Sequence, residues 1–357
     1  MTLILSNEDV EAALGMADCL AASEDAYKAL GRNEAATGVR GEILSPTGRE
    51  DALHSLLTMA GTVPGFGIGA VRINSDILTW PETEHGLRRE KVPAAPGGRY
   101  VGLVLLFSTE TGEPLAIYPD GIVQRMRVGA ACGLAAKRLA RGDARTLAIL
   151  GAGWQAGGQA MAAACVRDIA EIRCYSPTPA RREAFAAEWS DKLGIDVAAA
   201  NSLEEAVAGA DIVACATNSM QPVLPPELLE PGMHVSSVKR LELPPETVAR
   251  ADRVFTHVTG AESRITRIEG ADLSRDTDRA KDRMTSAIGQ RDMPTLPDLL
   301  LDRAPGRASD EEITMFLNYA GLGFQFAATG ALIIEKARAL SLGRDIPTGW
   351  LTSALPS

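Results

Sequence analysis

A glycine-rich turn between an apolar strand and a helix is the feature that most constrains the fold of this chain. Residues 146–150 (TLAIL) form a short, continuous apolar run, typical of a strand buried in a parallel sheet. The next six residues, GAGWQA, match the pattern G-x-G-x-x-G/A, in which the first glycine permits a tight turn and the second lets the backbone approach a pyrophosphate. The residues expected to contact a dinucleotide here are Gly151, Ala152, Gly153, Trp154, Gln155 and Ala156.

An alternation of strands and helices follows the glycine-rich turn. This context favours a dinucleotide-binding turn over the alternative, a strand–turn–helix that binds no ligand. Repeated β-α units predict an α/β fold with a doubly wound parallel sheet and right-handed crossovers. The expected helices cover residues 154–167, 179–192 and 203–209. The expected strands cover residues 172–175, 196–200, 211–216, 234–238 and 253–257.

The end of the second strand bears on which nicotinamide cofactor an NAD(P) site takes. A site for NAD normally offers Asp or Glu there, whereas residues 174–178 (CYSPT) supply no acid. Ser176, Thr178 and Arg181 suit a 2′-phosphate, so the sequence favours NADP(H). The alternative is that Arg181 and Arg182 belong to the solvated face of a helix. Two further residues expected to contact the cofactor are Thr217 and Val238.

The segments before this unit have a different texture, and 357 residues suffice for two domains. Residues 5–31 predict a helix capped by Ser6. Residues 39–126, with Gly/Pro punctuation and short β-branched or apolar runs, predict an antiparallel β region. Residues 127–141 predict a helix so rich in Gly and Ala that another backbone could approach it closely.

The C-terminal part is harder to assign. Residues 262–310 are polar and Pro-rich, which predicts a long irregular excursion. Residues 311–342 predict an Ala-rich helix that packs back on the N-terminal part and cannot belong to the parallel sheet as a strand.

Composition excludes several classes of function. A net charge of −10 without a basic stripe excludes nucleic acid as a partner. No apolar run reaches about 18 residues, and no basic segment precedes an apolar one at the N-terminus, so we expect neither a membrane span nor export. The 4 His lack metal-ligand spacing, so no metal site is expected. The 5 widely spaced Cys, with no C-x-x-C, indicate reduced thiols in the cytoplasm.

A series of motifs extends along almost the whole chain. They are LSNEDV, Val39-Arg40 followed by Pro46, Asp120-Gly121 leading into Arg127, ILGAGWQA, EEAVAGADIVACAT, EPGMHV and GLGFQFAATGA. In their order and spacing the chain resembles the ornithine cyclodeaminase/μ-crystallin family. The resemblance implies a Rossmann NAD(P)-binding domain, residues 127–314, and a discontinuous α+β substrate domain, residues 1–126 and 315–357, that forms a homodimer through its sheet. It also implies hydride transfer between nicotinamide and the α-carbon of an amino or imino acid.

Two arginines, Arg40 and Arg127, stand where the family places its carboxylate-binding arginines. Arg offers a planar fork that binds a carboxylate in bidentate fashion. We also expect Arg127 to begin a helix, whose N-terminus would attract the same anion. Without the resemblance, each would be interpreted as a surface arginine.

Two departures from the family pattern shape the catalytic hypotheses. The family usually has a Lys in the strand where this chain has Arg72, and a high pKa suits Arg72 to substrate binding better than to proton transfer. Cyclodeaminases also have an Asp after the fifth strand of the nucleotide domain, where this chain reads SVKRLE at residues 237–242. Glu242 is the nearest carboxylate and Lys239 is a new candidate proton carrier, each weighed against a solvated turn residue. The candidate catalytic residues are Arg72, Lys239 and Glu242, and the candidate substrate-binding residues are Arg40, Arg72 and Arg127.

These departures weaken ornithine cyclodeamination and favour an NAD(P)-dependent oxidoreductase of the imine or ketimine reductase or amino-acid dehydrogenase type. One alternative is a cyclodeaminase that releases ammonia and recycles its NAD. Another is a non-catalytic nucleotide-binding protein or subunit of the μ-crystallin kind. The expected partners are a small amino or imino acid and a second copy of the chain.

Overall fold

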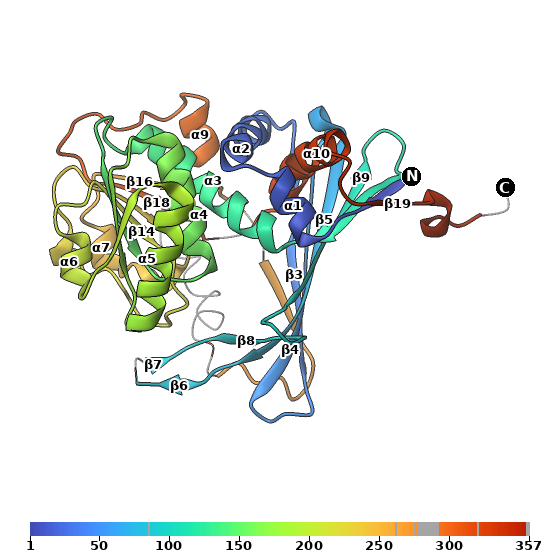
Figure 1. The fold of residues 1–357 in the computed structure, drawn as a ribbon, viewed down its shortest axis with the longest axis horizontal. Helices are drawn as coiled ribbons and strands as arrows, with labels where there is room; N and C mark the ends of the chain where they lie inside the picture. The colour runs from blue at the N-terminus through green and yellow to red at the C-terminus, as the bar shows by residue number, and fades with distance from the viewer. Residues whose placement is uncertain (85, 261–262, 275, 277–292, 320, 355–357) are drawn as a thin grey trace.

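Two sheets, with one long buried helix between them, organise the molecule (Figure 1). The structure is a computed structural model, and it describes residues 1–84, 86–260, 263–274, 276, 293–319 and 321–354. One sheet is parallel and the other is mainly antiparallel, and α3 (Gly121–Leu139) contacts elements on both sides. The predicted α/β class is confirmed.

The parallel sheet contains seven strands in the described part of the chain. The glycine-rich turn follows β11, one of its inner strands. All of its neighbouring pairs are parallel, and the strands predicted from the β-α alternation are confirmed. The chain runs outward in one direction from β11 and then resumes on its other side at β14, so β11 and β14 flank the point where ligands bind in such sheets. In spatial order the strands are β13 (Asp196–Ala199), β12 (Glu171–Tyr175), β11 (Thr146–Leu150), β14 (Ile212–Cys215), β15 (His234–Ser237), β18 (Thr314–Leu317) and β16 (Arg253–Thr256).

Helices rich in small residues pack closely beside this sheet. A Cβ built on Gly129 of α3 would lie 2.3 Å from the carbonyl oxygen of Gly158 in α4, so the two backbones touch, as the Gly/Ala-rich sequence predicted. The helical segments of this part are α4 (Trp154–Val166), α5 (Pro179–Leu193), α6 (Leu203–Val207), α7 (Pro245–Val248), α9 (Leu296–Leu300) and the 3-10 turns η2 (Pro226–Leu228) and η3 (Arg240–Glu242).

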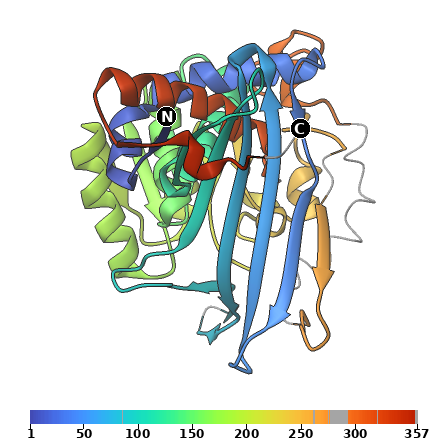
Figure 2. The same ribbon diagram turned by 90° about the vertical axis from the view of Figure 1, so that its right-hand side faces the viewer.

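The second sheet is built on long antiparallel strands, which Figure 2 shows extending well beyond the helices. Its strands, in spatial order, are β17 (Ser263–Arg267), β3 (Arg40–Pro46), β4 (Ala52–Val63), β5 (Ile68–Thr79), β9 (Val101–Ser108), β10 (Pro114–Pro119), β1 (Thr2–Ile4) and β19 (Arg344–Ile346). Short strands beside them are β2 (Ala36–Thr37), β8 (Glu90–Val92) and the pair β6 (Glu82–Thr83) and β7 (Gly86–Leu87). The helices packed with this sheet are α1 (Asn7–Ala13), α2 (Met16–Gly31) and α10 (Phe324–Ala339), and the turns η1 (Pro64–Phe66) and η6 (Thr348–Leu351) complete this part.

The segment at 311–342 departs from the sequence-based prediction. It is not a single helix, because Thr314–Leu317 form β18 inside the parallel sheet and α10 begins only at Phe324. A four-residue apolar run shows neither helical nor strand periodicity, so the Ala-rich helix after it dominated the pattern. The predicted domain limits stay a prediction. The limit placed between residues 314 and 315 falls inside β18.

Two further predictions are wrong in part. The excursion at 262–310 contains β17, which pairs in parallel with β3, as well as α9; its residues 262, 275 and 277–292 lie outside the described chain. The segment at 5–31 is divided into α1 and α2, although Ser6 does cap α1 with a reciprocal capping box. Polar residues on β17 gave no strand pattern, because an exposed edge strand buries little of either face.

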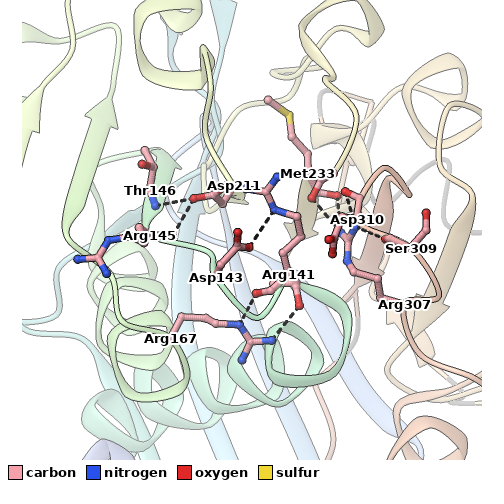
Figure 3. A network of polar contacts seen from close by, with 12 residues as sticks. Arg141, Asp143, Arg145, Thr146, Arg167, Asp211, Met233, Arg307, Ser309 and Asp310 are labelled. Carbon is pink, nitrogen blue, oxygen red and sulfur yellow. Dashed lines mark hydrogen bonds and ion pairs between the residues drawn. The ribbon is translucent and has the colours of Figure 1, made fainter.

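A network of arginines fixes the C-terminal end of α3 to the amino-terminal edge of the parallel sheet (Figure 3). Arg307 Nε donates a hydrogen bond to the carbonyl oxygen of Leu139 at 2.6 Å. Asp211 pairs with Arg141 and accepts a hydrogen bond from the N–H of Thr146 at 2.9 Å. Since the last carbonyls of a helix lack intrahelical partners, these donors stabilise the position of α3 and of the residues it carries. Arg167 donates hydrogen bonds to the carbonyl oxygens of Ala136, Lys137, Ala140 and Arg141.

None of the helices in the described residues is long and apolar enough to cross a membrane.

Candidate active site

The turn after β11 is shaped to receive a phosphate group. Gly151 has a φ of +115°, and a Cβ built on it would lie 2.4 Å from the carbonyl oxygen of Ala216. Gly153 precedes the first turn of α4, and a Cβ built there would meet no described atom within 4 Å. The first N–H groups of a helix have no intrahelical acceptor, so at this end of α4 they are available to an anion. The backbone of this turn therefore fits a pyrophosphate.

Side chains of the turn pack against their surroundings. Ala156 is fully buried, with 0% exposure, where α4 meets the sheet. Trp154 Nε1 donates a hydrogen bond to the carbonyl oxygen of Gly121 at 2.9 Å, and its ring centroid lies 4.1 Å from the guanidinium carbon of Arg125. The indole N–H is thereby used within the protein, so only the backbone of Trp154 would be available to a nucleotide.

The residues predicted to contact a 2′-phosphate follow β12, which pairs in parallel with β11. Ser176 is buried, and its carbonyl oxygen accepts a hydrogen bond from Arg182 Nη1 at 3.0 Å. Thr178 is the N-cap residue of α5, and Arg181 in the first turn is exposed. The Arg181 side chain makes no hydrogen bond or ion pair within the part of the chain that the structure describes. Arg182, which was not among the predicted cofactor contacts, is the arginine whose side chain reaches back to Ser176.

A cavity of about 280 Å³ lies where the two sheets meet. It brings together Arg40, Arg72 and Arg127, the three arginines predicted to bind substrate. Gln155 and Val238, both predicted to contact the cofactor, line the same cavity, so a nucleotide bound at the glycine turn would end beside the arginines. The other basic lining residues are Arg89, Lys239 and Arg240. Among the lining residues that the structure describes, Glu42 is the single carboxylate.

Arg127 is a buried cation held by neutral groups. Its side chain is 3% exposed, and it donates hydrogen bonds to Gln325 Oε1 at 2.8 Å and to Gln124 Oε1 at 2.7 Å. Its Nε is buried without a hydrogen-bond partner, and among the described residues no carboxylate pairs with it. Burial, with a smaller contribution from Arg72, lowers the pKa of Arg127 to about 9, so the group is still protonated at neutral pH. A carboxylate entering the cavity would supply the missing counter-charge.

Two details differ from the expectation for this pair of arginines. Arg127 does not begin a helix, because α3 starts at Gly121 and Arg127 lies in its second turn, so the helix N-terminus does not act with it. Arg72 is paired within the protein: its Nη2 lies 2.6 Å and its Nε 2.7 Å from Asp120 Oδ2. Both guanidinium carbons lie within 5.5 Å of the ring centroid of Phe326, which fixes them at one wall of the cavity.

The residues proposed for proton transfer occupy different environments. Glu242 is 0% exposed, and burial raises the pKa of its carboxyl group although hydrogen bonds oppose the shift. Its hydrogen bonds connect the loop after β14 to the loop after β15, and Glu242 does not line the cavity. Lys239 does line it, with Nζ donating to the carbonyl oxygen of Ser219 at 2.6 Å. Within the described chain, the five donors to Glu242 are the N–H and the hydroxyl of Thr217, the hydroxyl of Ser237, and the N–H groups of Val238 and Lys239.

Sequence reasoning missed one wall of the cavity. Glu42 lies two residues from Arg40 on β3, and strand alternation could have indicated that both face the same side. Ser263 and Ile265 of β17 also line the cavity, and no local signal in the polar segment around them indicated that it would reach β3.

A doubly wound parallel sheet, a glycine turn at its switch point and an adjoining cavity are the features of a dinucleotide-dependent enzyme, and the arginines that line the cavity suit a small anionic ligand. The chain belongs to the ornithine cyclodeaminase/mu-crystallin family, whose model matches residues 98–341.

Relatives with assigned names lie within this family. The chain is 33% identical over 250 residues to a Delta(1)-pyrroline-2-carboxylate reductase of Bacillus cereus, covering 69% of this chain and 74% of that protein. It is 29% identical over 353 residues to an alanine dehydrogenase of Archaeoglobus fulgidus, covering 97% and 98%. Among solved structures, the Delta(1)-pyrroline-2-carboxylate reductase of Thermococcus litoralis, in complex with NADH and L-proline, matches with a TM-score of 0.79 and 28% identity, covering 97% of this chain and 100% of that one.

Proposed function

We propose that this chain reduces a small cyclic imino acid, with the substrate carboxylate bound at Arg127. The chain is an NAD(P)-dependent oxidoreductase that moves hydride between nicotinamide and the α-carbon of a small amino or imino acid. The observation that carries the refinement is Arg127: a buried, protonated group that lines the cavity and pairs with no carboxylate of the described residues. The names of the relatives from Bacillus cereus and Thermococcus litoralis support a cyclic substrate.

The side chains of the cavity would bind and orient the substrate. Arg127 and Arg40 hold the carboxylate, and the Arg72–Asp120 pair keeps a rigid, nearly neutral wall beside it. Gln155 and Val238 line the cavity and would contact the cofactor, which would supply or accept the hydride when bound. Lys239, on the same side as these residues, is the candidate proton carrier.

The residues after β12 support a preference for NADP(H). Residues 174–178 contain no acid that would accept hydrogen bonds from a ribose 2′-hydroxyl, and Thr178, Arg181 and Arg182 lie at the start of α5 beside this position. Titration with both reduced cofactors should give the lower Kd for NADPH. An NADH complex tenfold tighter than the NADPH complex would contradict the preference.

A single assay tests the proposed reaction. Purified protein with NADPH or NADH and Δ1-pyrroline-2-carboxylate should oxidise the cofactor and form proline in equal amounts, without release of ammonia. Ammonia release from amino acids without net cofactor turnover would instead indicate a cyclodeaminase. A tight cofactor complex that turns over no cyclic imine or 2-oxo acid with an amine would indicate a binding protein.

We also propose that two copies of the chain pair through the outer face of the antiparallel sheet. Ile43 is 45% exposed, Leu56 36%, Val101 43% and Leu103 40%. Ile43 and Leu56 lie on the neighbouring strands β3 and β4, and β5 separates these from β9, which carries Val101 and Leu103. Exposed apolar side chains on one sheet face are typical of an interface, and the same face on a second copy would cover them. Light scattering should give the mass of a dimer for the native chain and of a monomer for Leu103→Glu.

A cytoplasmic location is the remaining proposal. Its support is that all five cysteines are free thiols, four of them buried, which suits a reducing compartment.

A further inference from the structure

We propose that Glu42 is a further substrate-binding residue, whose carboxylate receives the protonated nitrogen of the imino or amino acid. The inference rests on the proposed function and deepens it, because it assigns the group that recognises the atom next to the reacting carbon. Glu42 is 3% exposed and is the single carboxylate among the described residues that line the cavity.

The position of Glu42 on β3 matches the shape of an α-amino acid. Arg40 and Glu42 lie two residues apart and both line the cavity, so their Cα atoms are about 7 Å apart on one face of the strand. One side chain is a cation and the other an anion. An α-imino acid carries its carboxylate and its charged nitrogen on the same carbon, so a single ligand can meet both residues at once.

The Glu42 carboxylate is held in place from the neighbouring strand. Ser55, on β4, donates its hydroxyl to Glu42 Oε1, and β4 places Leu57 opposite Glu42 in the register. On the other side, Ile265 of β17 is the register partner of Glu42 and lines the same cavity. Apolar neighbours on both sides limit water, and an ion pair formed there is stronger than one in solvent.

The charges on the opposite side favour the same orientation. Arg127 has no carboxylate partner among the described residues, whereas Arg72 is paired with Asp120. The ligand carboxylate is therefore attracted to Arg127, and the ligand nitrogen then faces the carboxylate of Glu42.

The chemistry explains what this contact does. When hydride bonds to the α-carbon of a C=N group, the π electrons move to nitrogen, so protonation of that nitrogen beforehand makes the carbon more electrophilic. Glu42 stabilises this protonated form. The neutral amine formed in this way then takes up one proton, for which Lys239 is the candidate carrier, and becomes a cation facing the same carboxylate.

Two ligands that differ only at the nitrogen test the contact. L-proline carries a cationic ring nitrogen, and tetrahydrofuran-2-carboxylate has a neutral ring oxygen in its place. Calorimetric titrations with the protein saturated by oxidised cofactor should show tenfold or greater preference for proline, since a hydrogen bond between charged groups is stronger than one between neutral groups. Glu42→Gln should reduce this ratio to near one by weakening proline alone.

Matched variants separate this role from a structural one. Asp51→Asn removes an exposed carboxylate from the loop between β3 and β4 and should keep the full ratio, and Glu42→Asp should retain part of it. An unchanged ratio in Glu42→Gln, or equal loss of both ligands, would overturn the proposal. The proposal would also be overturned if the native protein bound proline no more tightly than tetrahydrofuran-2-carboxylate, or bound neither ligand.

The binding ratio does not depend on turnover. If the native protein fails to reduce any imine but discriminates the two ligands through Glu42, the proposed reaction is wrong and the nitrogen contact stands. If it reduces Δ1-pyrroline-2-carboxylate and Glu42→Gln leaves the ratio intact, the reverse holds.

Discussion

Arg72 and Asp120 form a buried ion pair beside the cavity, with Arg72 Nη2 2.6 Å from Asp120 Oδ2 and side-chain exposures of 8% and 11%. Asn74 Nδ2 lies 3.2 Å from the same oxygen. The charge of Arg72 is therefore compensated within the protein, whereas that of Arg127 is met by amide oxygens. From this asymmetry we expect Arg127 to take the larger part in binding a substrate carboxylate.

Asp120→Asn should destabilise the fold. The substitution leaves the Arg72 guanidinium buried without its counter-ion, and breaking such a pair from one side costs about 3–5 kcal/mol. The free energy of unfolding in urea measures this loss. The double variant Arg72→Met/Asp120→Asn should recover most of the stability, because no uncompensated charge remains. A double variant no more stable than Asp120→Asn would show that the loss does not come from the unpaired charge.

Arg127→Ala should raise KM for the imino acid about 30-fold or more, because loss of a buried charged partner costs about 2 kcal/mol or more of binding. Steady-state kinetics at saturating cofactor measure the change, and the Kd of the cofactor should stay close to the native value. Arg145→Ala is the matched control, since Arg145 pairs with Asp168 on the surface at 2.7 Å and does not line the cavity. Native KM in Arg127→Ala would remove Arg127 from the site.

Stability should fall in mild acid through His234. Burial lowers the pKa of this imidazole to about 3, and in β15 its Nδ1 lies 2.9 Å from Thr314 Oγ1. The folded state keeps His234 neutral while the unfolded chain takes up a proton below about pH 6.5, so stability present above that pH is lost as the pH falls toward 3. For this one group the loss between pH 7 and pH 5 is about 2 kcal/mol. Urea titrations at both pH values should show a smaller difference in His234→Gln than in the native chain, and an equal difference would contradict this account.

The extent to which the sequence predicted the fold follows from how each signal arises. The turn at residues 151–156 and the strands beside it were predictable because glycine spacing and buried apolar runs are local properties. β18 was missed because a short apolar strand beside an Ala-rich helix has no period of its own. β17 was missed because pairing between distant segments leaves no local pattern.

The same distinction holds for the site. The cavity brings together Arg40, Arg72 and Arg127, which sequence motifs had singled out one by one. The sequence did not predict that Arg72 is paired with a carboxylate and Arg127 is not, because this difference depends on Asp120, the N-cap residue of α3, contacting Arg72. Glu242 looked like a candidate acid by its place in the sequence, but only the three-dimensional structure shows that backbone and hydroxyl donors occupy it.

Transfer of labelled hydride tests the central claim most directly. The protein should be incubated with Δ1-pyrroline-2-carboxylate and a reduced cofactor carrying deuterium at nicotinamide C4, and the product analysed by mass spectrometry and NMR. The account predicts proline with a single deuterium at the α-carbon from one of the two C4-deuterated epimers of the cofactor, and none from the other. Proline without deuterium from either epimer would contradict it. So would a protein that forms no proline in this assay but releases ammonia when an amino acid is added.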